Sequence, residues 1–375
     1  MANRSGFKSL WVRWNSRSLL YVVFLLLMSG CDKPDHDDRV NRTVLIYMAA
    51  DNDLSDNALR NIEQMKSSYP VDGKNNLLVF VNLPEEKPYL IKIEADTEIV
   101  IKQYEEFNSL EVQNMRRVLV DMIGMYPANE YGLVLWSHGS SWLPPNFQTR
   151  SFGEEKGLQM DITELSDALP VKFDFILFDA CLMGSVEVAY ELKDNADYII
   201  ASSTETLYTG FPYDMIIPDL IAASPDLQKV AKKYMDYYRQ LTGIYRSATI
   251  SVINTNELEK LAEITSLLLG GNSINMDLFN RSVVQRLDSY EEQYIFDFSD
   301  FIHKAFPDSQ TEPFDNQLQK VVLYKAHTDE FMGDFFINTY CGLSSYIPLK
   351  SRDDLNNYYQ RLKWYKDSGY NRLFN

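Results

Sequence analysis

One histidine and one cysteine each follow an apolar run, and this feature of the sequence most clearly suggests chemistry. His138 comes two residues after Gly132–Trp136, and Cys181 comes three residues after Phe175–Phe178. Catalysis by a cysteine requires a thiolate and an acid for the leaving group, and residues adjacent in space supply them. The two side chains could therefore form the catalytic pair of a thiol hydrolase. Types and spacing alone also fit a buried core cysteine and a histidine that caps a strand.

Apolar runs alternate with amphipathic segments along the chain, and this alternation predicts the framework that positions the pair. Continuous apolar runs are typical of buried strands, and they occupy Thr43–Met48, Leu77–Val81, Tyr89–Ile93, Gly132–Trp136, Phe175–Phe178, Tyr198–Ala201 and 248–253, with a late strand region at Phe336–Ile347. Helices are expected from Ser55 onward and over Ser109–Ile123, Ser185–Leu192, Glu257–Leu269 and Tyr290–Ala305. The pattern predicts an α/β fold with a mostly parallel central sheet and helices on both faces. Ligands of such sheets gather at the carboxyl ends of the strands, where His138 and Cys181 are placed.

The first 30 residues have the composition of a secretory signal. Basic residues without acids precede the apolar run Leu19–Met28, and Ser29-Gly30-Cys31 follows it. The run spans about 15 Å as a helix, which is too short for a bilayer core of about 30 Å. Met28–Cys31 resembles a bacterial lipobox, although Met28 replaces the usual Leu. We therefore predict a lipoprotein signal over 1–30, lipid on Cys31 and an acidic tether over 31–42. An ordinary signal peptide that ends near a cysteine is the alternative.

Composition limits the partners and cofactors. The 53 acidic residues outnumber the 36 basic ones and give a net charge of -17, which repels phosphate backbones, so no nucleic-acid binding is expected. Three cysteines without a CxxC spacing do not form a disulfide framework, and without an HExxH motif no catalytic metal is predicted. No Pro- or Gly-rich linker divides the remainder, so we expect a catalytic region over 43–245 and a C-terminal extension of the same unit over 246–375.

The strings around the histidine and the cysteine resemble a known family. LVLWSHGSSW, followed by FILFDACLMGSVEVAYEL, is similar to the paired signatures of the clostripain family of cysteine peptidases. The opening TVLIYMAADNDLSDNALRNI and the intervening MDITELSDAL also match that family's pattern. The resemblance implies a caspase-like three-layer sandwich and cysteine endopeptidase activity. Secreted, lipid-anchored members of the family occur in bacteria, in agreement with the N-terminal signal.

The resemblance also implies roles for single residues. Cys181 corresponds to the nucleophile and His138 to the general acid and base, while the backbone N–H groups of Gly139 and Cys181 would bind the oxyanion. Three neighbours of the histidine are expected to form loop walls, namely Ser140, Ser141 and Trp142. Some family members respond to calcium, but no EF-hand spacing is present, so no cofactor is predicted.

The family's preference for Arg or Lys before the scissile bond implies acidic residues near the nucleophile. Alternation along the strand points Asp179 to the same side as Cys181, so its carboxylate could lie beneath the cleft. The alternative is that this carboxylate only holds the neighbouring backbone. Many relatives add a second acid where this chain has Thr209, and Glu205 or Asp214 are the candidates to replace it. We therefore expect a weakened basic preference.

Relatives are often cut between the histidine and cysteine strands, and here Leu143–Gln159 is long, polar and contains proline. Arg150 and Lys156 are the expected self-cleavage sites in this segment. The sequence thus predicts a monomeric, lipid-anchored cysteine endopeptidase of the bacterial cell envelope, in the outer membrane on its periplasmic face or at the cell surface, acting on peptides or proteins. Two alternatives stay open: a catalytically silent binding lipoprotein on the peptidase fold, and an acyltransferase or transpeptidase that uses the same pair.

Overall fold

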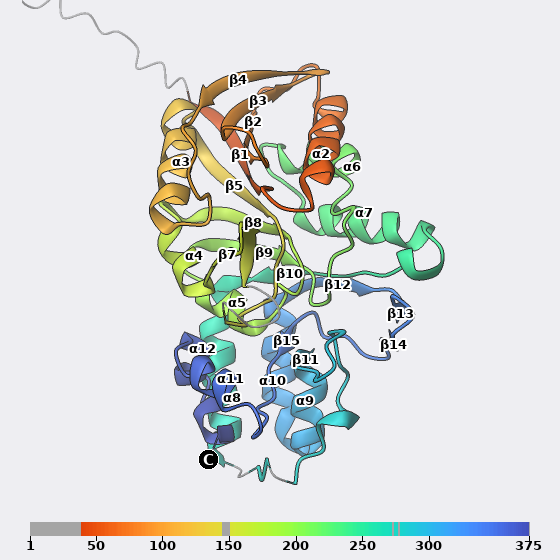
Figure 1. Ribbon diagram of the computed structural model, residues 1–375. Coiled ribbons are helices and arrows are strands. Elements are labelled where there is room, and N and C mark those ends of the chain that lie inside the picture. Colours follow the sequence, from red (N-terminus) through yellow and green to blue (C-terminus); the bar gives the residue numbers. More distant parts are fainter. Residues whose placement is uncertain (1–38, 145–150, 272–273, 277, 375) are drawn as a thin grey trace, which may run out of the picture. The chain divides into compact units, whose positions relative to one another are not determined.

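A nine-stranded sheet carries the apolar runs of the sequence (Figure 1). The computed structural model describes residues 39–144, 151–271, 274–276 and 278–374. In chain order, the sheet contains β1 (Val40–Ala49), β2 (Asn76–Asn82), β3 (Tyr89–Glu94), β4 (Thr97–Gln103), β5 (Ala128–Trp136), β8 (Phe173–Asp179), β9 (Ala196–Ala201), β10 (Thr249–Asn254) and β12 (Val322–His327). Their spatial order is β12-β10-β9-β8-β5-β1-β2-β3-β4.

The centre of this sheet is parallel and both edges are antiparallel. Strands β2, β1, β5, β8 and β9 pair in parallel. Strands β3 and β4 at one edge, and β10 and β12 at the other, pair antiparallel. The mostly parallel central sheet is therefore confirmed. The edge strand β4 is largely exposed and is not a buried apolar run, so the sequence did not predict it.

Helices cover both faces of the sheet, because side chains along each central strand alternate between two cores. On β1, Val44 and Ile46 pack in one core, whereas Leu45 and Tyr47 pack in the other. The first core includes side chains of α2 (Ser55–Ser68), α6 (Tyr213–Leu220) and α7 (Leu227–Gln240). The second includes side chains of α3 (Val112–Met125), α4 (Ile162–Ala168) and α5 (Val186–Glu191). The predicted three-layer arrangement is confirmed.

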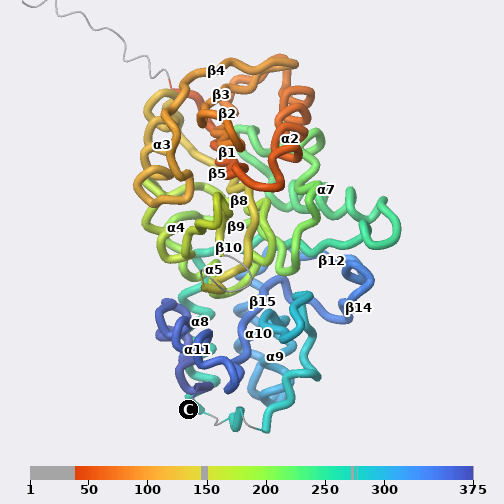
Figure 2. Tube along the Cα trace, in the orientation of Figure 1, coloured from red at the N-terminus to blue at the C-terminus, as the bar shows by residue number. Residues whose placement is uncertain are grey.

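The C-terminal helices extend the second core. They are α8 (Leu258–Gly271), α9 (Phe298–Ala305), α10 (Asp308–Val321), α11 (Asp353–Tyr359) and α12 (Lys363–Asp367). Figure 2 shows the blue C-terminal trace beside α8. Remaining short strands are β6 (Phe152–Glu155), β7 (Leu158–Met160), β11 (Phe296–Asp297), β13 (Glu330–Phe331), β14 (Phe335–Phe336) and β15 (Ser344–Ser345), and 3-10 turns span Gly243–Tyr245, Thr255–Glu257, Arg281–Val283 and Tyr370–Phe374.

A buried glutamate joins this C-terminal region to the helix that follows the candidate cysteine. The Glu187 carboxylate on α5 accepts hydrogen bonds from the Ser345 hydroxyl, the Tyr346 backbone N–H and the Tyr359 hydroxyl. Burial raises the pKa of Glu187, and the three donors partly oppose that shift. Nearby, the Ser344 N–H donates to the Gly184 carbonyl at 3.0 Å. The C-terminal region thereby fixes the backbone just beyond Cys181.

Two expected elements are wrong, and side-chain acceptors explain both differences. The helix predicted over Tyr290–Ala305 is helical only from Phe298, because the Asp288 carboxylate accepts backbone N–H groups from residues 290, 294 and 295. The strand region predicted over Phe336–Ile347 contains only β14 and β15. Its backbone instead donates to side chains, as the Cys341 N–H does to Asp297.

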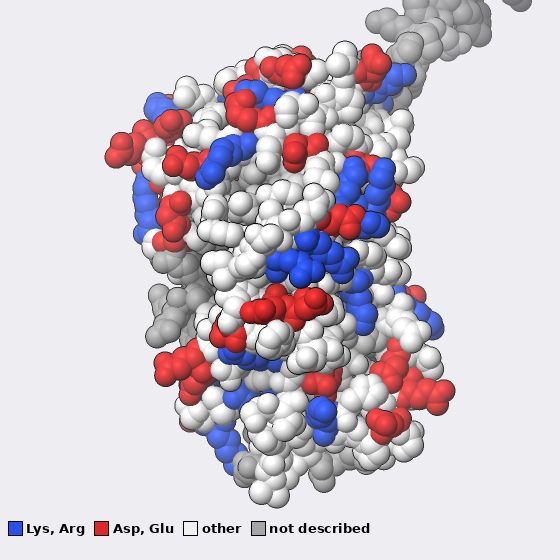
Figure 3. Space-filling view, turned by 90° about the vertical axis from the view of Figure 1, so that its right-hand side faces the viewer, with Lys and Arg blue, Asp and Glu red and all other residues white. Residues whose placement is uncertain are grey.

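Charged groups of both signs share the surface, so the net negative charge is not a uniform shell. On the face in Figure 3, a group of basic side chains lies directly above an acidic group. None of the helices within the described residues combines the length and the apolar character that a membrane crossing requires.

Candidate active site

The pairing of β5 with β8 brings the candidate histidine and cysteine to one edge of the sheet. In this parallel register Trp136 lies opposite Asp179, and the Ser137 N–H donates to the Asp179 carbonyl at 3.3 Å. Each of these paired strand ends is followed, two residues later, by a candidate catalytic residue, His138 on one chain segment and Cys181 on the other. The two residues therefore stand at the same level past the carboxyl ends of neighbouring strands.

Gly139 places a backbone amide beside the cysteine loop. Gly139 lies opposite Phe152 in a short antiparallel pairing. The residues on either side make its hydrogen bonds: the Gly153 N–H donates to the His138 carbonyl, and the Ser140 N–H donates to the Ser151 carbonyl. The Gly139 N–H consequently points away from β6. A Cβ atom on Gly139 would lie 2.6 Å from the Cys181 carbonyl oxygen, so only glycine allows this close approach.

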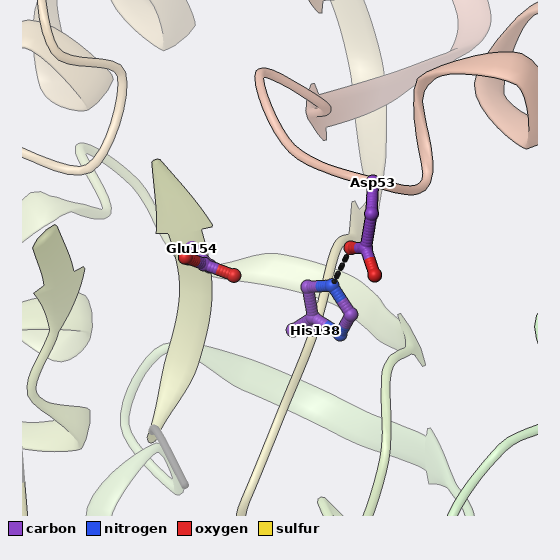
Figure 4. Close-up of side chains that lie close together, drawn as sticks. All are labelled: Asp53, His138 and Glu154. Atoms are coloured by element: carbon purple, nitrogen blue, oxygen red, sulfur yellow. Dashed lines mark hydrogen bonds and ion pairs between the residues drawn. The ribbon is translucent and has the colours of Figure 1, made fainter. Parts of the chain in front are cut away.

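The imidazole of His138 is held by a carboxylate that the sequence did not single out. His138 Nε2 lies 2.7 Å from Asp53 Oδ1, in the loop that follows β1 (Figure 4). A carboxylate accepts this hydrogen bond, so Nε2 carries a proton, and Nδ1 is the ring nitrogen left for other contacts. The His138 side chain is 31% exposed, which leaves it open to solvent. The only sequence signal for Asp53 was its place in a polar turn after a buried strand.

The Cys181 thiol is half-buried and neutral in this state. Its Sγ accepts the Thr206 N–H at 3.2 Å and donates to the Thr206 carbonyl at 3.5 Å. Burial raises the pKa of the Cys181 thiol to about 12, and the charges of Glu205 and Asp179 raise it further, against the opposing effect of the Thr206 N–H. A reaction at this thiol would therefore require the loss of its proton.

The backbone beyond Cys181 adopts an uncommon conformation. Leu182 has φ of 64°, a left-handed value that non-glycine residues rarely adopt. Two hydrogen bonds to the loop after β9 hold it there, from Leu182 N–H to Thr204 O at 2.9 Å and from Gly184 N–H to Ser202 O at 2.7 Å. Such local strain persists only where surrounding contacts fix it, and it commonly accompanies functional sites.

The Asp179 carboxylate is buried under the loop that leads into α6. Its Oδ2 accepts the Phe211 N–H at 3.1 Å and the Tyr213 hydroxyl at 2.9 Å. Gly210 (φ 63°) passes directly over it, because a Cβ there would lie 2.6 Å from Oδ2. Burial raises the pKa of Asp179 to about 6. Asp179 thus lies near Cys181 and also holds neighbouring backbone.

The other candidate acids differ in their surroundings. Glu205 Oε1 accepts the Ser289 N–H at 3.0 Å, and burial raises the pKa of this carboxyl. Its Oε2 is buried and has no hydrogen-bond partner among the described residues. The Thr209 hydroxyl lies 3.0 Å from that of Tyr238, while Asp214 is exposed in the first turn of α6. Of these three, Glu205 alone presents an unsatisfied buried acceptor near the cysteine.

The expectation that three neighbours of His138 form loop walls is wrong. Ser140, Ser141 and Trp142 are all fully buried. The Ser141 hydroxyl donates to the Ser185 hydroxyl at 2.7 Å, and Trp142 packs against the rings of Tyr346 and Tyr359. These residues therefore anchor the histidine loop to the core and do not line a cleft.

The remaining candidates concern processing and anchoring. Cys31 and Arg150 lie outside the described residues. Lys156 occupies the turn between β6 and β7 with φ of 50°, and its ammonium pairs with Asp51 at 3.1 Å and Glu106 at 3.0 Å. A tight, ion-paired turn is a poor protease substrate, which favours Arg150 over Lys156 as the self-cleavage site. Self-cleavage at either stays a prediction.

A three-layer α/β fold that presents a histidine and a cysteine on neighbouring parallel strand ends has the architecture of a caspase-like cysteine peptidase. The chain belongs to the clostripain family of cysteine peptidases, whose family model matches residues 46–373. Clostripain from Hathewaya histolytica is 27% identical over 219 residues, which cover 46% of this chain and 41% of clostripain. This chain therefore spans about two fifths of that curated relative.

Solved structures confirm both the fold class and the family resemblance. An inactive zymogen C11 protease from Parabacteroides distasonis is 34% identical with a TM-score of 0.79, covering 88% of this chain and 98% of that one. A secreted C11 cysteine protease from Bacteroides thetaiotaomicron, solved with an irreversible peptide inhibitor, is 31% identical with a TM-score of 0.79, covering 88% and 99%.

The raised pKa of Asp179 predicts a specific loss of stability as pH rises. The folded value of about 6 exceeds the ordinary 3.8, so the folded state binds this proton more tightly than the unfolded state. Its stabilising contribution is complete below pH 4, falls by up to about 3 kcal/mol as pH rises toward 6, and then stays constant. Denaturant unfolding from pH 4 to 7 should therefore show a fall that is larger in wild type than in Asp179→Asn by up to about 3 kcal/mol, because the other buried carboxyls remain in the variant.

Asp214→Asn, which alters an exposed aspartate of the next helix, is the matched control and should retain the wild-type pH dependence. Identical pH dependence in wild type and Asp179→Asn would contradict the assigned environment of Asp179.

Proposed function

We propose that this chain is a secreted, lipid-anchored cysteine endopeptidase in which His138 and Cys181 form the catalytic pair. The observation that carries the proposal is the β5–β8 register, which sets both residues two positions past paired strand ends. Family membership and the secreted relatives support it. The rival silent binding protein would have no need for a histidine oriented by Asp53 beside a glycine amide.

In the proposed reaction the cysteine becomes a nucleophile only when a substrate is bound. The resting thiol is neutral, so His138 Nδ1 accepts its proton as Sγ attacks the scissile carbonyl carbon. The carbonyl oxygen becomes an oxyanion, and the N–H groups of Gly139 and Cys181 donate to it. The C–N bond then breaks while His138 returns the proton to the leaving amine. Water hydrolyses the thioester and regenerates the thiol.

Asp53 acts on this reaction through the imidazole and is a positioning residue. Its hydrogen bond to Nε2 fixes the tautomer with Nδ1 toward the reacting atoms, and its charge stabilises the protonated ring that forms during attack. Asp53 is 81% exposed, so solvent weakens its electrostatic effect. Orientation of the ring is therefore its main contribution.

Catalytic variants test the pair directly. Cys181→Ala and His138→Ala should each lower kcat/KM at least about 10³-fold. The two side chains act as one catalytic unit, so the loss of either removes most of the rate enhancement of both. Asp53→Asn should lower kcat while leaving KM nearly unchanged, because it alters the orientation of the imidazole and not substrate binding. Steady-state kinetics on reporter peptides with the protein lacking residues 1–31 provide the measurement.

Cys341→Ala is the matched control, since this second described thiol is buried in the core and should be dispensable for turnover. Mass spectrometry of the same samples should find any fragment cut after Arg150 or Lys156 in wild type and not in Cys181→Ala. Substantial turnover by Cys181→Ala would contradict the pair.

The proposed substrate preference is for Arg or Lys before the scissile bond, weakened by the missing second acid. Asp179 supplies negative charge beneath the nucleophile at neutral pH. The buried Oε2 of Glu205 has no hydrogen-bond partner among the described residues, so the basic side chain of a substrate would find an acceptor there. Thr209 offers only a hydroxyl where many relatives carry an acid.

Restoring that acid should sharpen the preference. Thr209→Asp should increase the ratio of kcat/KM for Arg and Lys peptides over neutral ones by about ten- to a hundredfold, because one added charge-assisted hydrogen bond contributes about 1.5–3 kcal/mol. Thr209→Asn is the control of equal shape without charge. If the wild-type protein cleaves after an apolar residue and does not cleave after Arg or Lys, the proposed preference is excluded.

Membrane attachment is proposed to come from lipid on Cys31. A lipoprotein carries several acyl chains, and more than one is required for stable attachment. Wild type grown with a labelled fatty acid should incorporate the label and sediment with membranes, whereas Cys31→Ala should do neither. Unlabelled mature protein would show that Cys31 only adjoins a cleavage site.

A further inference from the structure

Glu154 joins His138 and Asp53 in a cluster that the proposed reaction does not require. One ligand atom from each residue lies within 4.8 Å of the other two, and all three side chains converge in Figure 4. We propose that Asp53, His138 and Glu154 form a zinc site, and that Zn²⁺ bound there reversibly inhibits the peptidase. The inhibition rests on the proposed function, whereas the binding site does not.

The spacing of the three groups fits a zinc ion with small adjustments. Zinc–nitrogen and zinc–oxygen bonds of about 2.0–2.2 Å in a tetrahedron separate ligand atoms by roughly 3.3–3.6 Å. The His138–Asp53 contact of 2.7 Å is shorter than this, and the 4.8 Å limit on the cluster is longer. Small side-chain rotations therefore suffice, and the partly exposed His138 leaves the ion a path from solvent.

Backbone contacts hold the three ligands in place before an ion arrives. The Gly153 N–H donates to the His138 carbonyl at 2.9 Å, which ties β6 to the histidine loop. The Asn52 side-chain amide donates to the Glu154 carbonyl at 2.8 Å, which ties β6 to the loop that carries Asp53. The Lys156–Asp51 ion pair joins the same two segments again. Such support lowers the cost of ordering the site.

The chemistry of the ligands selects zinc over the hard cations. Calcium prefers six to eight oxygen ligands, and magnesium prefers oxygen in a near-ideal octahedron. One imidazole and two carboxylates instead match zinc sites with three protein ligands, which keep a fourth position open. Asp53 and Glu154 also supply the two negative charges that balance a divalent ion.

Zinc at this site would remove His138 from the reaction. Coordination through Nδ1 occupies the nitrogen that must accept the thiol proton. Coordination through Nε2 displaces the Asp53 hydrogen bond and leaves a neutral ring that keeps its proton on Nδ1. In either case the imidazole no longer cycles between base and acid, so turnover stops while the cysteine stays intact.

The binding test uses Cys181→Ala protein lacking residues 1–31, because this removes the reactive thiol as a zinc ligand. Isothermal titration with ZnCl₂ should detect one site per chain. Adding Glu154→Gln should weaken zinc at least about tenfold, since even the loss of a supporting residue costs about 10–100-fold in metal affinity. Glu105→Gln, at an exposed carboxylate outside the cluster, is the matched control and should not change binding.

The inhibition test uses protein with Cys181 present. Zinc should inhibit turnover, EDTA should restore it, and Glu154→Gln should require at least about tenfold more zinc for half-inhibition of its own metal-free rate. Any of three results would overturn the proposal. Zinc affinity could be unchanged in Glu154→Gln, the zinc site could be absent from Cys181→Ala, or calcium could bind more tightly than zinc. An inactive wild type would refute the proposed function and leave the titration of Cys181→Ala as an independent test.

Discussion

The parallel pairing of β5 with β8 is the contact on which the rest of the site depends. Side chains on β8 alternate between two cores, with Leu177 in one and Phe178 in the other. A slip of one residue would turn every such side chain to the wrong layer, so both cores oppose it. The pairing that satisfies both cores sets Trp136 opposite Asp179 and holds the histidine and cysteine loops at one level. Packing far from the reacting atoms thus determines the geometry of the proposed catalytic pair.

The surroundings of the two loops suit the proposed roles of a nucleophile that rests as a neutral thiol and a base whose ring is held in one orientation. Buried carboxylates near Cys181 favour its neutral thiol, and the C-terminal region fixes the backbone beyond it through Gly184 and Glu187. The histidine loop is anchored by the buried Trp142, and its imidazole is aimed by Asp53. A neutral thiol limits unwanted oxidation and alkylation, since the thiolate is the reactive form. In the proposed reaction, substrate binding then supplies the geometry for proton transfer.

Sequence patterns predicted the parts of this structure that rest on continuous apolar runs. The five parallel strands are such runs, so the strand ends that carry His138 and Cys181 followed from them. Asp53 was missed because it lies 85 residues before His138, in a polar turn without periodicity. The helix expected over Tyr290–Ala305 was wrong because one carboxylate, that of Asp288, captures the backbone donors that a helix would use. Long-range side-chain contacts of this kind leave no local signal.

The central claim is that Cys181, His138 and the Gly139 amide converge on one scissile carbonyl. A crystal structure of the chain with an irreversible peptidyl inhibitor tests it most directly. We predict a covalent bond at Cys181 Sγ, the inhibitor's carbonyl oxygen about 2.7–3.1 Å from the Gly139 and Cys181 nitrogens, and His138 Nδ1 facing the reacting atoms. Labelling at Cys341, or a carbonyl oxygen directed away from Gly139, would contradict it.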